Sequence, residues 1–242
     1  MFKLIVLGII QGIFEWLPVS SEGIVALLSK YLVSDFNPIE IALFLHLGTV
    51  LAVLIYFRKE WRKVIELKDN KLLRFLIIST AISFLIGYPL YNTITDFVIG
   101  SNLLILVGFG LLITAFFHKK KISLNMSEDK TALLTGFLQG LSVIPGLSRS
   151  GSTIFGLSLG SHDTEKILTT SYMMSLPVIL GSTIYLFLNN PVFIIETWPA
   201  LLSSFLVGLV SLDFLIKKSK EIDFFKFVLT FSVLCFLGAL LK

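Results

Sequence analysis

The sequence predicts an all-α polytopic membrane protein that forms a single membrane domain over residues 1–242. Hydrophobic residues make up 55% of the chain and charged residues only 15%, whereas about a quarter of the residues of a soluble domain are charged. Several apolar runs also approach the length of about 20 residues that a helix needs to cross a bilayer. This composition excludes a disordered chain, a secreted disulfide scaffold and a nucleic-acid-binding protein.

About six transmembrane helices are expected, because only helices satisfy all their backbone polar groups within such segments in lipid. The candidate runs lie near Ile39–Phe57, Arg74–Tyr88, Leu103–Phe117, Ile167–Leu188, Leu201–Ile216 and Phe227–Leu241. The earlier run Leu4–Phe14 has no small-residue cleavage site and is followed by more membrane segments, so we do not interpret it as a signal peptide. Cys235 is the only cysteine, which argues against a disulfide framework or a thiolate metal site.

The positions of lysine and arginine predict which side of the membrane each loop faces. They gather in four places: Arg58–Arg74, Lys119–Lys130, Lys166 and Lys217–Lys226. The connecting segments Pro89–Asn102 and Asn189–Pro199 contain none. Because cytoplasmic loops carry an excess of positive charge, the four basic regions are predicted to be cytoplasmic and the two segments without lysine or arginine external.

Two apolar regions, Gly8–Gly23 and Gly136–Gly151, are interrupted by proline, glycine and serine, and they resemble each other. In one register, five residues of the first region match five of the second: Gly8, Gln11, Gly12, Ser20 and Gly23 match Gly136, Gln139, Gly140, Ser148 and Gly151. Pro18 and Pro145 match with a shift of one position. We interpret this as an internal repeat, with repeat 1 at about residues 1–118 and repeat 2 at about 131–242.

Each interrupted region is expected to break at its proline, because proline removes a backbone donor and the residue before it resists helix. Such breaks at membrane depth are tolerated only where they are buried in protein or line a wet cavity. The charge distribution has the first region enter from outside and the second from inside. We therefore predict an inverted-topology repeat with two broken re-entrant segments, whose breaks meet near the midplane. The alternative is that the prolines merely kink two ordinary spanning helices.

The second break carries Arg149, which has no role in setting topology. Ser148, Arg149, Ser150 and Gly151 precede an expected half-helix, Ser152–Leu159. The start of a helix presents unpaired N–H groups, and together with a guanidinium and several hydroxyls it forms an anion site suited to phosphate. Arginine at the centre of a membrane costs at least about 2.5–3.5 kcal/mol, which favours a functional role. The alternative is a structural bridge from Arg149 to Glu15 or Glu22.

The first break supplies carboxylates. Gln11 and Glu15 are four residues apart and therefore share one helix face, and Glu22 follows the pair Ser20–Ser21. If the repeat brings the breaks together, Glu15 and Arg149 line one polar pocket.

These motifs resemble those of a known family. PGLSRSGST (Pro145–Thr153) matches the PGxSRSxxT signature of the bacitracin-resistance type undecaprenyl-diphosphatases. Gln11–Glu15 matches that family's (E/Q)xxxE motif, EWLPVSSEG resembles a second motif, and Leu45–Trp61 resembles its second-helix block. The resemblance implies broken inverted repeats, a site that opens outward, a cell-membrane location, and Mg²⁺ or Ca²⁺ dependence.

The resemblance also implies a reaction, in which a polyprenyl diphosphate is hydrolysed to the monophosphate. Arg149 would hold the diphosphate, Ser21 would be the nucleophile with Ser20 as second choice, and Glu15 would bind the cation with Gln11 or activate the attacking group. The expected substrate-binding residues are Ser20, Gly146, Ser148, Ser150, Gly151 and Thr153. The partners expected are the lipid substrate and the bilayer, with a homodimer as candidate assembly. The rival function is a polyprenyl-phosphate transporter or flippase that does not hydrolyse its lipid.

The chain departs from the family at one position. The family usually has a histidine where this sequence has Ile24, and Glu22 replaces the preceding serine or threonine. Either Glu22 takes over proton transfer, or His46 reaches the pocket from the next helix, or the activity is weak or altered. A lone histidine in an apolar run more often packs between helices than binds a ligand, so we interpret His46 as a packing residue.

Overall fold

In a computed structural model, the chain folds as helices, with no strand among the residues that the structure describes. These residues are 2–17, 20–33, 38–97, 102–119, 126–144, 146–160, 164–189, 191–218 and 224–240. The helices are α1 (Phe2–Phe14), α2 (Ser21–Leu32), α3 (Pro38–Tyr56), α4 (Arg58–Ile65), α5 (Asn70–Phe97), α6 (Asn102–Lys119), α7 (Glu128–Leu141), α8 (Arg149–Ser158), α9 (Thr164–Asn189), α10 (Pro191–Lys218) and α11 (Phe224–Leu240).

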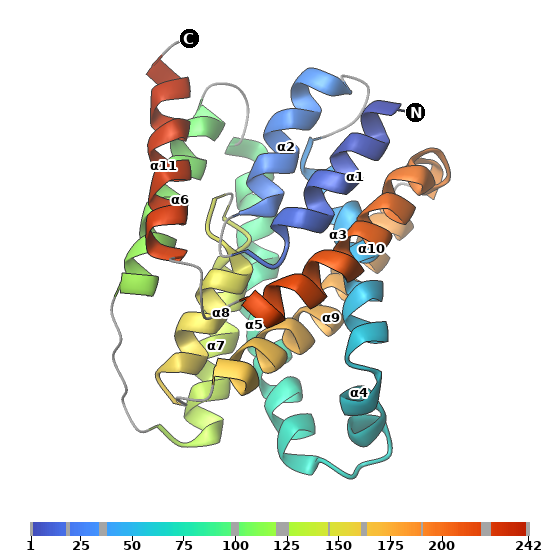
Figure 1. The fold of residues 1–242 in the computed structure, drawn as a ribbon, viewed down its shortest axis with the longest axis vertical. Coiled ribbons are helices and arrows are strands. Elements are labelled where there is room, and N and C mark those ends of the chain that lie inside the picture. Colours follow the sequence, from blue (N-terminus) through green and yellow to red (C-terminus); the bar gives the residue numbers. More distant parts are fainter. Residues whose placement is uncertain are drawn as a thin grey trace.

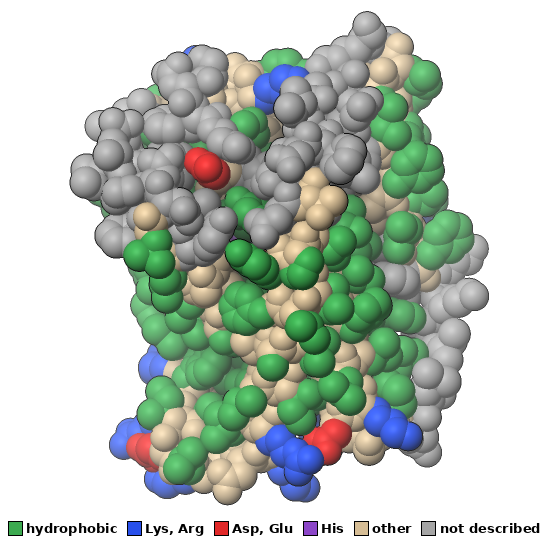
Figure 2. Space-filling view, turned by 180° about the vertical axis from the view of Figure 1, so that it is seen from behind, with side chains coloured by type: hydrophobic (Ala, Val, Ile, Leu, Met, Phe, Trp, Pro, Cys, Tyr) green, Lys and Arg blue, Asp and Glu red, His purple; other side chains and the backbone are tan. Residues whose placement is uncertain are grey.

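The predicted membrane segments are all helical and correspond to α3, α5, α6, α9, α10 and α11. Within the described ranges, parts of α5, α9 and α10 are long and apolar enough to cross a membrane. A fourth span is possible if α3 is joined to α4, which bends away from it by 80°. Figure 2 shows hydrophobic side chains over the middle of the face that it draws. These features confirm an all-α polytopic membrane protein.

Most basic side chains on the face drawn in Figure 2 lie at one end of the molecule. Figure 2 shows them gathered at the lower end, below the hydrophobic side chains, with a smaller patch near the upper end. In Figure 1 the lower end is the one that contains α4, the start of α5 and the start of α7. The same end was predicted to be cytoplasmic from the loop charges.

The two interrupted regions form helical hairpins that enter from opposite ends. In Figure 1, α1 descends from the upper end and α2 returns to it, whereas α7 rises from the basic end and α8 returns. The helices of the hairpins are short, from 10 residues in α8 to 14 in α7. None of them has the roughly 20 residues needed to cross the hydrocarbon core. Opposite entry is therefore confirmed, and the interpretation as merely kinked spanning helices is wrong. Pro18 and Pro145, the predicted break points, lie outside the described residues.

The hairpins pack crosswise on the other half of the chain. Helix α1 lies along α10, and α7 lies along α5, while α3 contacts α9 and α6 contacts α11. In each case a hairpin packs on a helix of the other half, and matching helices pack on each other. This is the packing expected if the two halves are related by a two-fold axis. The repeat boundaries near residues 118 and 131 stay a prediction.

Matching glycines explain the close packing of the hairpins. A Cβ on Gly8 would lie 2.1 Å from the carbonyl oxygen of Ala200 on α10. A Cβ on Gly136, the matching residue of α7, would lie 2.5 Å from the carbonyl oxygen of Ser79 on α5. Gly12 and Gly140 are equally crowded against the same two helices. Small residues spaced by four allow membrane helices to approach closely, so the repeated glycines hold each hairpin against its partner.

We predict that Gly8→Val destabilises the protein by about 1–3 kcal/mol, because the added side chain cannot fit against α10. The measurement is the thermal denaturation temperature of the purified protein in detergent. Ile9→Val is the matched control, since Ile9 is exposed on the lipid-facing side of the same helix. Equal denaturation temperatures for the two variants would contradict the packing role of Gly8.

Candidate functional site

Both returning helices begin in the same way at the centre of the molecule. Ser20 caps α2 by accepting a hydrogen bond from the N–H of Gly23 at 3.1 Å. Ser148 caps α8 by accepting one from the N–H of Gly151 at 3.1 Å. These residues are matching positions of the repeat. Serine is a preferred residue at a helix start because its oxygen satisfies an otherwise unpaired N–H group.

The tips of the hairpins are bonded to each other. The N–H of Gly146 donates to Oγ of Ser20 at 3.1 Å, and Oγ of Ser150 donates to the carbonyl oxygen of Leu17 at 2.9 Å. Gly146 has φ +95°, and a Cβ there would lie 2.4 Å from the backbone of Val107 on α6. The two breaks therefore meet and are joined by hydrogen bonds, and their meeting is what the sequence predicted.

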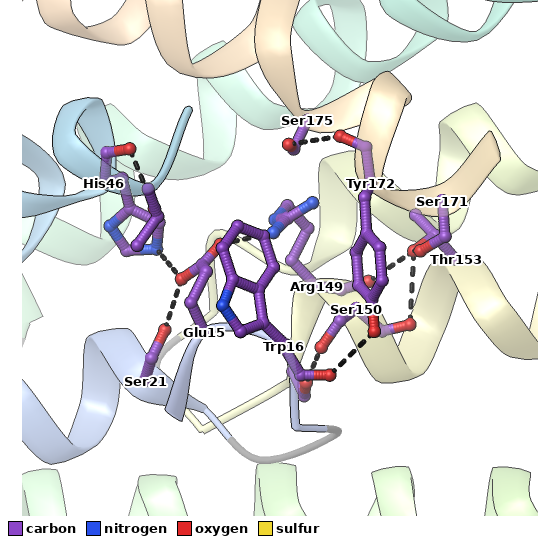
Figure 3. A network of polar contacts seen from close by, with 12 residues as sticks. Glu15, Trp16, Ser21, His46, Arg149, Ser150, Thr153, Ser171, Tyr172 and Ser175 are labelled. Atoms are coloured by element: carbon purple, nitrogen blue, oxygen red, sulfur yellow. Dashed lines mark hydrogen bonds and ion pairs between the residues drawn. The ribbon is translucent and has the colours of Figure 1, made fainter. Parts of the chain in front are cut away.

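Glu15 and Arg149 form a buried ion pair across the joined breaks. Nη2 of Arg149 contacts Oε1 of Glu15, and the two side chains are 12% and 2% exposed. Figure 3 shows the guanidinium and the carboxylate pointing toward each other from the two hairpins. Helix α8 begins at Arg149 itself, three residues earlier than the half-helix expected from the sequence. The expectation that both residues line one polar pocket is confirmed.

The second carboxylate oxygen of Glu15 is surrounded by donors. Nε2 of Gln11 donates to Oε2 at 2.6 Å and Oγ of Ser21 donates to it at 2.8 Å. Nε2 of His46 lies 3.2 Å from the same oxygen. The predicted shared face of Gln11 and Glu15 is confirmed. The interpretation of His46 as a packing residue is wrong, because α3 places its ring against the carboxylate.

Residues that the sequence did not single out, together with Thr153, hold the segments that carry the ion pair. Nε1 of Trp16 donates to the carbonyl oxygen of Gly208 on α10 at 2.9 Å, and the Tyr172 hydroxyl donates to the carbonyl oxygen of Trp16 at 3.0 Å. Thr153 Oγ1 and Ser171 Oγ are 2.6 Å apart. The Tyr172 and Ser171 contacts fix both hairpins to α9 (Figure 3), and the Trp16 contact fixes the first hairpin to α10. The sequence signals for them are that Trp16 adjoins Glu15 and that Thr153 ends the PGLSRSGST motif.

The ion pair lies in the wall of a cavity of about 320 Å³. Its apolar wall includes Phe84, Val178 and Ile179. Its polar lining is Glu15, Ser20, Ser21, Glu22, His46, Ser83, Tyr88, Tyr91, Gln139, Ser142, Ser148, Arg149, Ser150 and Ser182. The lining residues of α3 come from its first half and those of α9 from its second half, which places the cavity toward the end opposite the basic residues.

The predicted site residues are not all at the cavity surface. Gln11, Gly146, Gly151 and Thr153 do not line it. They instead hold Glu15, Ser20, Ser148 and the start of α8 in place, so their binding roles stay predictions. Ile24 packs against the apolar cluster around Val107, whereas Glu22 and His46, the two candidates left open for proton transfer, both line the cavity.

Arg149, which lines this cavity, has donors that no group of the protein uses. Its Nε and Nη1 atoms are buried and have no hydrogen-bond partner. A buried donor without a partner costs free energy, and a guanidinium presents its donors in a fork that matches phosphate oxygens. The site can therefore bind an oxyanion beside the start of α8.

The Glu15–Gln11 pair does not fit a divalent cation in this arrangement. Both oxygens of Glu15 already face protein donors, and Gln11 presents its amide N–H group to it. No group of three or more His, Cys, Asp or Glu side chains in the described part of the chain is placed to hold a metal ion.

The fold and site define a class, the polytopic membrane proteins in which two inverted re-entrant hairpins enclose a buried Arg–Glu site. A model of the family described as bacitracin resistance protein BacA matches residues 4–237. The chain belongs to this family.

Similar proteins extend over nearly the whole chain. An undecaprenyl-diphosphatase of Haloarcula marismortui is 34% identical, with 98% of this chain and 96% of the relative covered. One of Methanococcoides burtonii is 33% identical, with 95% of each covered. One of Halothermothrix orenii is 38% identical over 75% of this chain and 72% of the relative.

We predict that Gly146→Ala lowers the denaturation temperature, since the residue would meet α6 and adopt a left-handed conformation that costs of order 1–3 kcal/mol outside glycine. The check is thermal denaturation in detergent. Gly208→Ala is the control, because its Cβ would meet only side-chain and Cα atoms, at 3.2 Å and beyond. A Gly146→Ala variant as stable as this control would show that the locked tips do not require glycine.

Proposed function

We propose that the protein is an integral membrane hydrolase that converts a polyprenyl diphosphate, of the undecaprenyl type, to the monophosphate and releases phosphate. The observation that carries this proposal is the pair of buried donors without a hydrogen-bond partner on Arg149, a residue that lines the cavity together with serine side chains. The apolar cavity wall from α5 and α9 suits the first part of a prenyl tail. The names of the relatives support the same substrate.

We propose a role for each residue at the centre. Arg149 binds the diphosphate oxygens through Nε and Nη1 and stabilises the charge that develops on them. Ser21 attacks the terminal phosphorus, and its proton passes to Glu15, whose Oε2 already accepts the Ser21 hydroxyl. The Oγ–P bond forms while the bond from phosphorus to the bridging oxygen breaks, which frees the prenyl monophosphate. Water then cleaves the phosphoserine and releases inorganic phosphate.

Ser20 is less suited to attack than Ser21. Its Oγ accepts two backbone N–H groups, from Gly23 and Gly146, so its lone pairs already hold the two hairpins together. We therefore assign Ser21 as nucleophile and Ser20 as the residue that fixes the tip.

A divalent cation, which the family resemblance led us to expect, is proposed to enter with the substrate. Hard cations bind phosphate oxygens together with one or two carboxylates. Glu22 lines the cavity and is the carboxylate proposed to face such an ion.

The proposed location is the plasma membrane, with the site on the external half. The position of the cavity opposite the basic end supports this orientation. The homodimer stays a prediction.

Arg149→Ala is expected to lower kcat/KM for phosphate release from a long-chain prenyl diphosphate by about 10²–10³-fold, because charge on the transferring group loses its main partner. Phosphate release by purified protein in detergent is the readout. Arg74→Ala is the matched control, since Arg74 is exposed and pairs with Asp129 at the basic end. Equal rates for wild type and Arg149→Ala would sink the proposal, and lipid binding without phosphate release would favour a carrier.

Ser21→Ala is expected to abolish turnover with little change in stability, with a loss of about 10³-fold or more if Ser21 is the nucleophile. Ser20→Ala should instead lower the denaturation temperature, because it removes a cap and the bond to Gly146. The readouts are phosphate release and thermal denaturation of the two variants side by side. Full activity of Ser21→Ala would mean that water attacks the substrate directly.

A further inference from the structure

His46 stands between two acceptors. Its Nδ1 lies 2.6 Å from the carbonyl oxygen of Ala42, one turn earlier in α3, and its Nε2 lies 3.2 Å from Oε2 of Glu15. A carbonyl oxygen only accepts, so Nδ1 carries a proton. Glu15 contacts Arg149 and accepts from Ser21 and Gln11, as an ionised carboxylate does, so Nε2 also carries one. The ring is therefore an imidazolium paired with Glu15.

Two cations thus share the carboxylate, one on each oxygen. Arg149 comes from α8 and meets Oε1, whereas His46 comes from α3 and meets Oε2. The oxygen that faces His46 is also the one that accepts the Ser21 hydroxyl. Figure 3 shows His46 and Arg149 on opposite sides of Glu15. The two contacts are not equivalent, because Arg149 also has to bind the diphosphate.

We infer that His46 is a positioning residue that keeps Oε2 of Glu15 directed at Ser21 while Arg149 engages the substrate; this inference rests on the proposed function. Without His46, a guanidinium drawn toward phosphate would leave Glu15 with only the donors of its own hairpin, Gln11 and Ser21, and free to turn away from Ser21. A displacement of about 1 Å at such a group costs on the order of 10²-fold in rate.

The backbone that carries His46 is rigidly held. Gly48 packs so closely on α10 that a Cβ would lie 2.6 Å from the carbonyl oxygen of Leu201. Ser204 on α10 donates to the carbonyl oxygen of Leu45 at 2.9 Å. Helix α10 also packs against α1, which ends at the residue before Glu15. The imidazole and the carboxylate therefore stand on one scaffold and keep their separation when ligands bind.

Substitution of His46 by glutamine, asparagine or leucine distinguishes the contribution of Nε2 from that of Nδ1. Glutamine places an N–H donor near the Nε2 position and can still reach Glu15. Asparagine places its amide near the Nδ1 position and cannot. Leucine fills the space with no donor. Thr49→Val is the control for disturbance of α3, because the Thr49 hydroxyl bonds only to the backbone of its own helix in the described structure.

The test is the steady-state kinetics of phosphate release. His46→Gln is expected to retain most of kcat, while His46→Asn and His46→Leu lose about 10–100-fold. KM should change by less than about two-fold in all three, since Arg149 holds the diphosphate. Thr49→Val should match wild type. The inference is overturned if the three His46 variants have equal kcat, or if the loss appears in KM alone.

A measurement without turnover separates this inference from the proposed function. In a thermal-denaturation cycle, His46→Leu should lower the denaturation temperature in wild type but much less in a Glu15→Gln background, because the charged partner is then absent. Additive shifts would overturn the pairing of His46 with Glu15. Absence of phosphate release from wild type would instead sink the proposed function, and the cycle would still decide whether the pair exists.

Discussion

The ion pair between Glu15 and Arg149 is the constraint on which the rest of the structure depends. Each side chain alone would be costly to bury among apolar helices. Removing one partner of a buried pair leaves the other charge uncompensated and destabilises the fold by about 3–5 kcal/mol. The two residues belong to different hairpins, which enter from opposite ends of the molecule. Glu15 and Arg149 can therefore meet only if both breaks reach the same depth. The serine caps and the hydrogen bonds between the tips hold the two breaks at that depth.

The same constraint explains why the two halves of the chain resemble each other yet differ at the site. The shared residues are those that build the hairpins, namely the glycines of the packing faces and the serines of the caps. The residues that differ are those proposed to perform the chemistry, since Val143 stands where the first half has Glu15, and Ser21 stands where the second half has Arg149. One half supplies the carboxylate and the proposed nucleophile, and the other supplies the cation. A single composite site results from two similar frameworks.

Much of this architecture could be predicted from the sequence, because it depends on local signals. Proline, glycine and serine in apolar surroundings indicated the hairpins, the loop charges indicated their opposite entry, and the burial cost of Arg149 and Glu15 indicated the site. The sequence left open that His46 reaches the pocket but favoured a packing residue, since its neighbours in α3 are apolar and Glu15 is brought to it by another part of the chain. The capping by Ser20 and Ser148 had a signal in the repeated serine and glycine positions. The 80° bend between α3 and α4 has no comparable signal in the sequence around Phe57.

The crosswise packing of the hairpins has a consequence for how the protein is made. Helix α7 meets α5, which has already left the ribosome when α7 emerges, so the second hairpin can dock at once. Helix α1 meets α10, which is synthesised near the end of the chain. The first hairpin, with its carboxylate, must therefore wait in or at the membrane for most of translation, and insertion is completed by the last segments rather than in chain order.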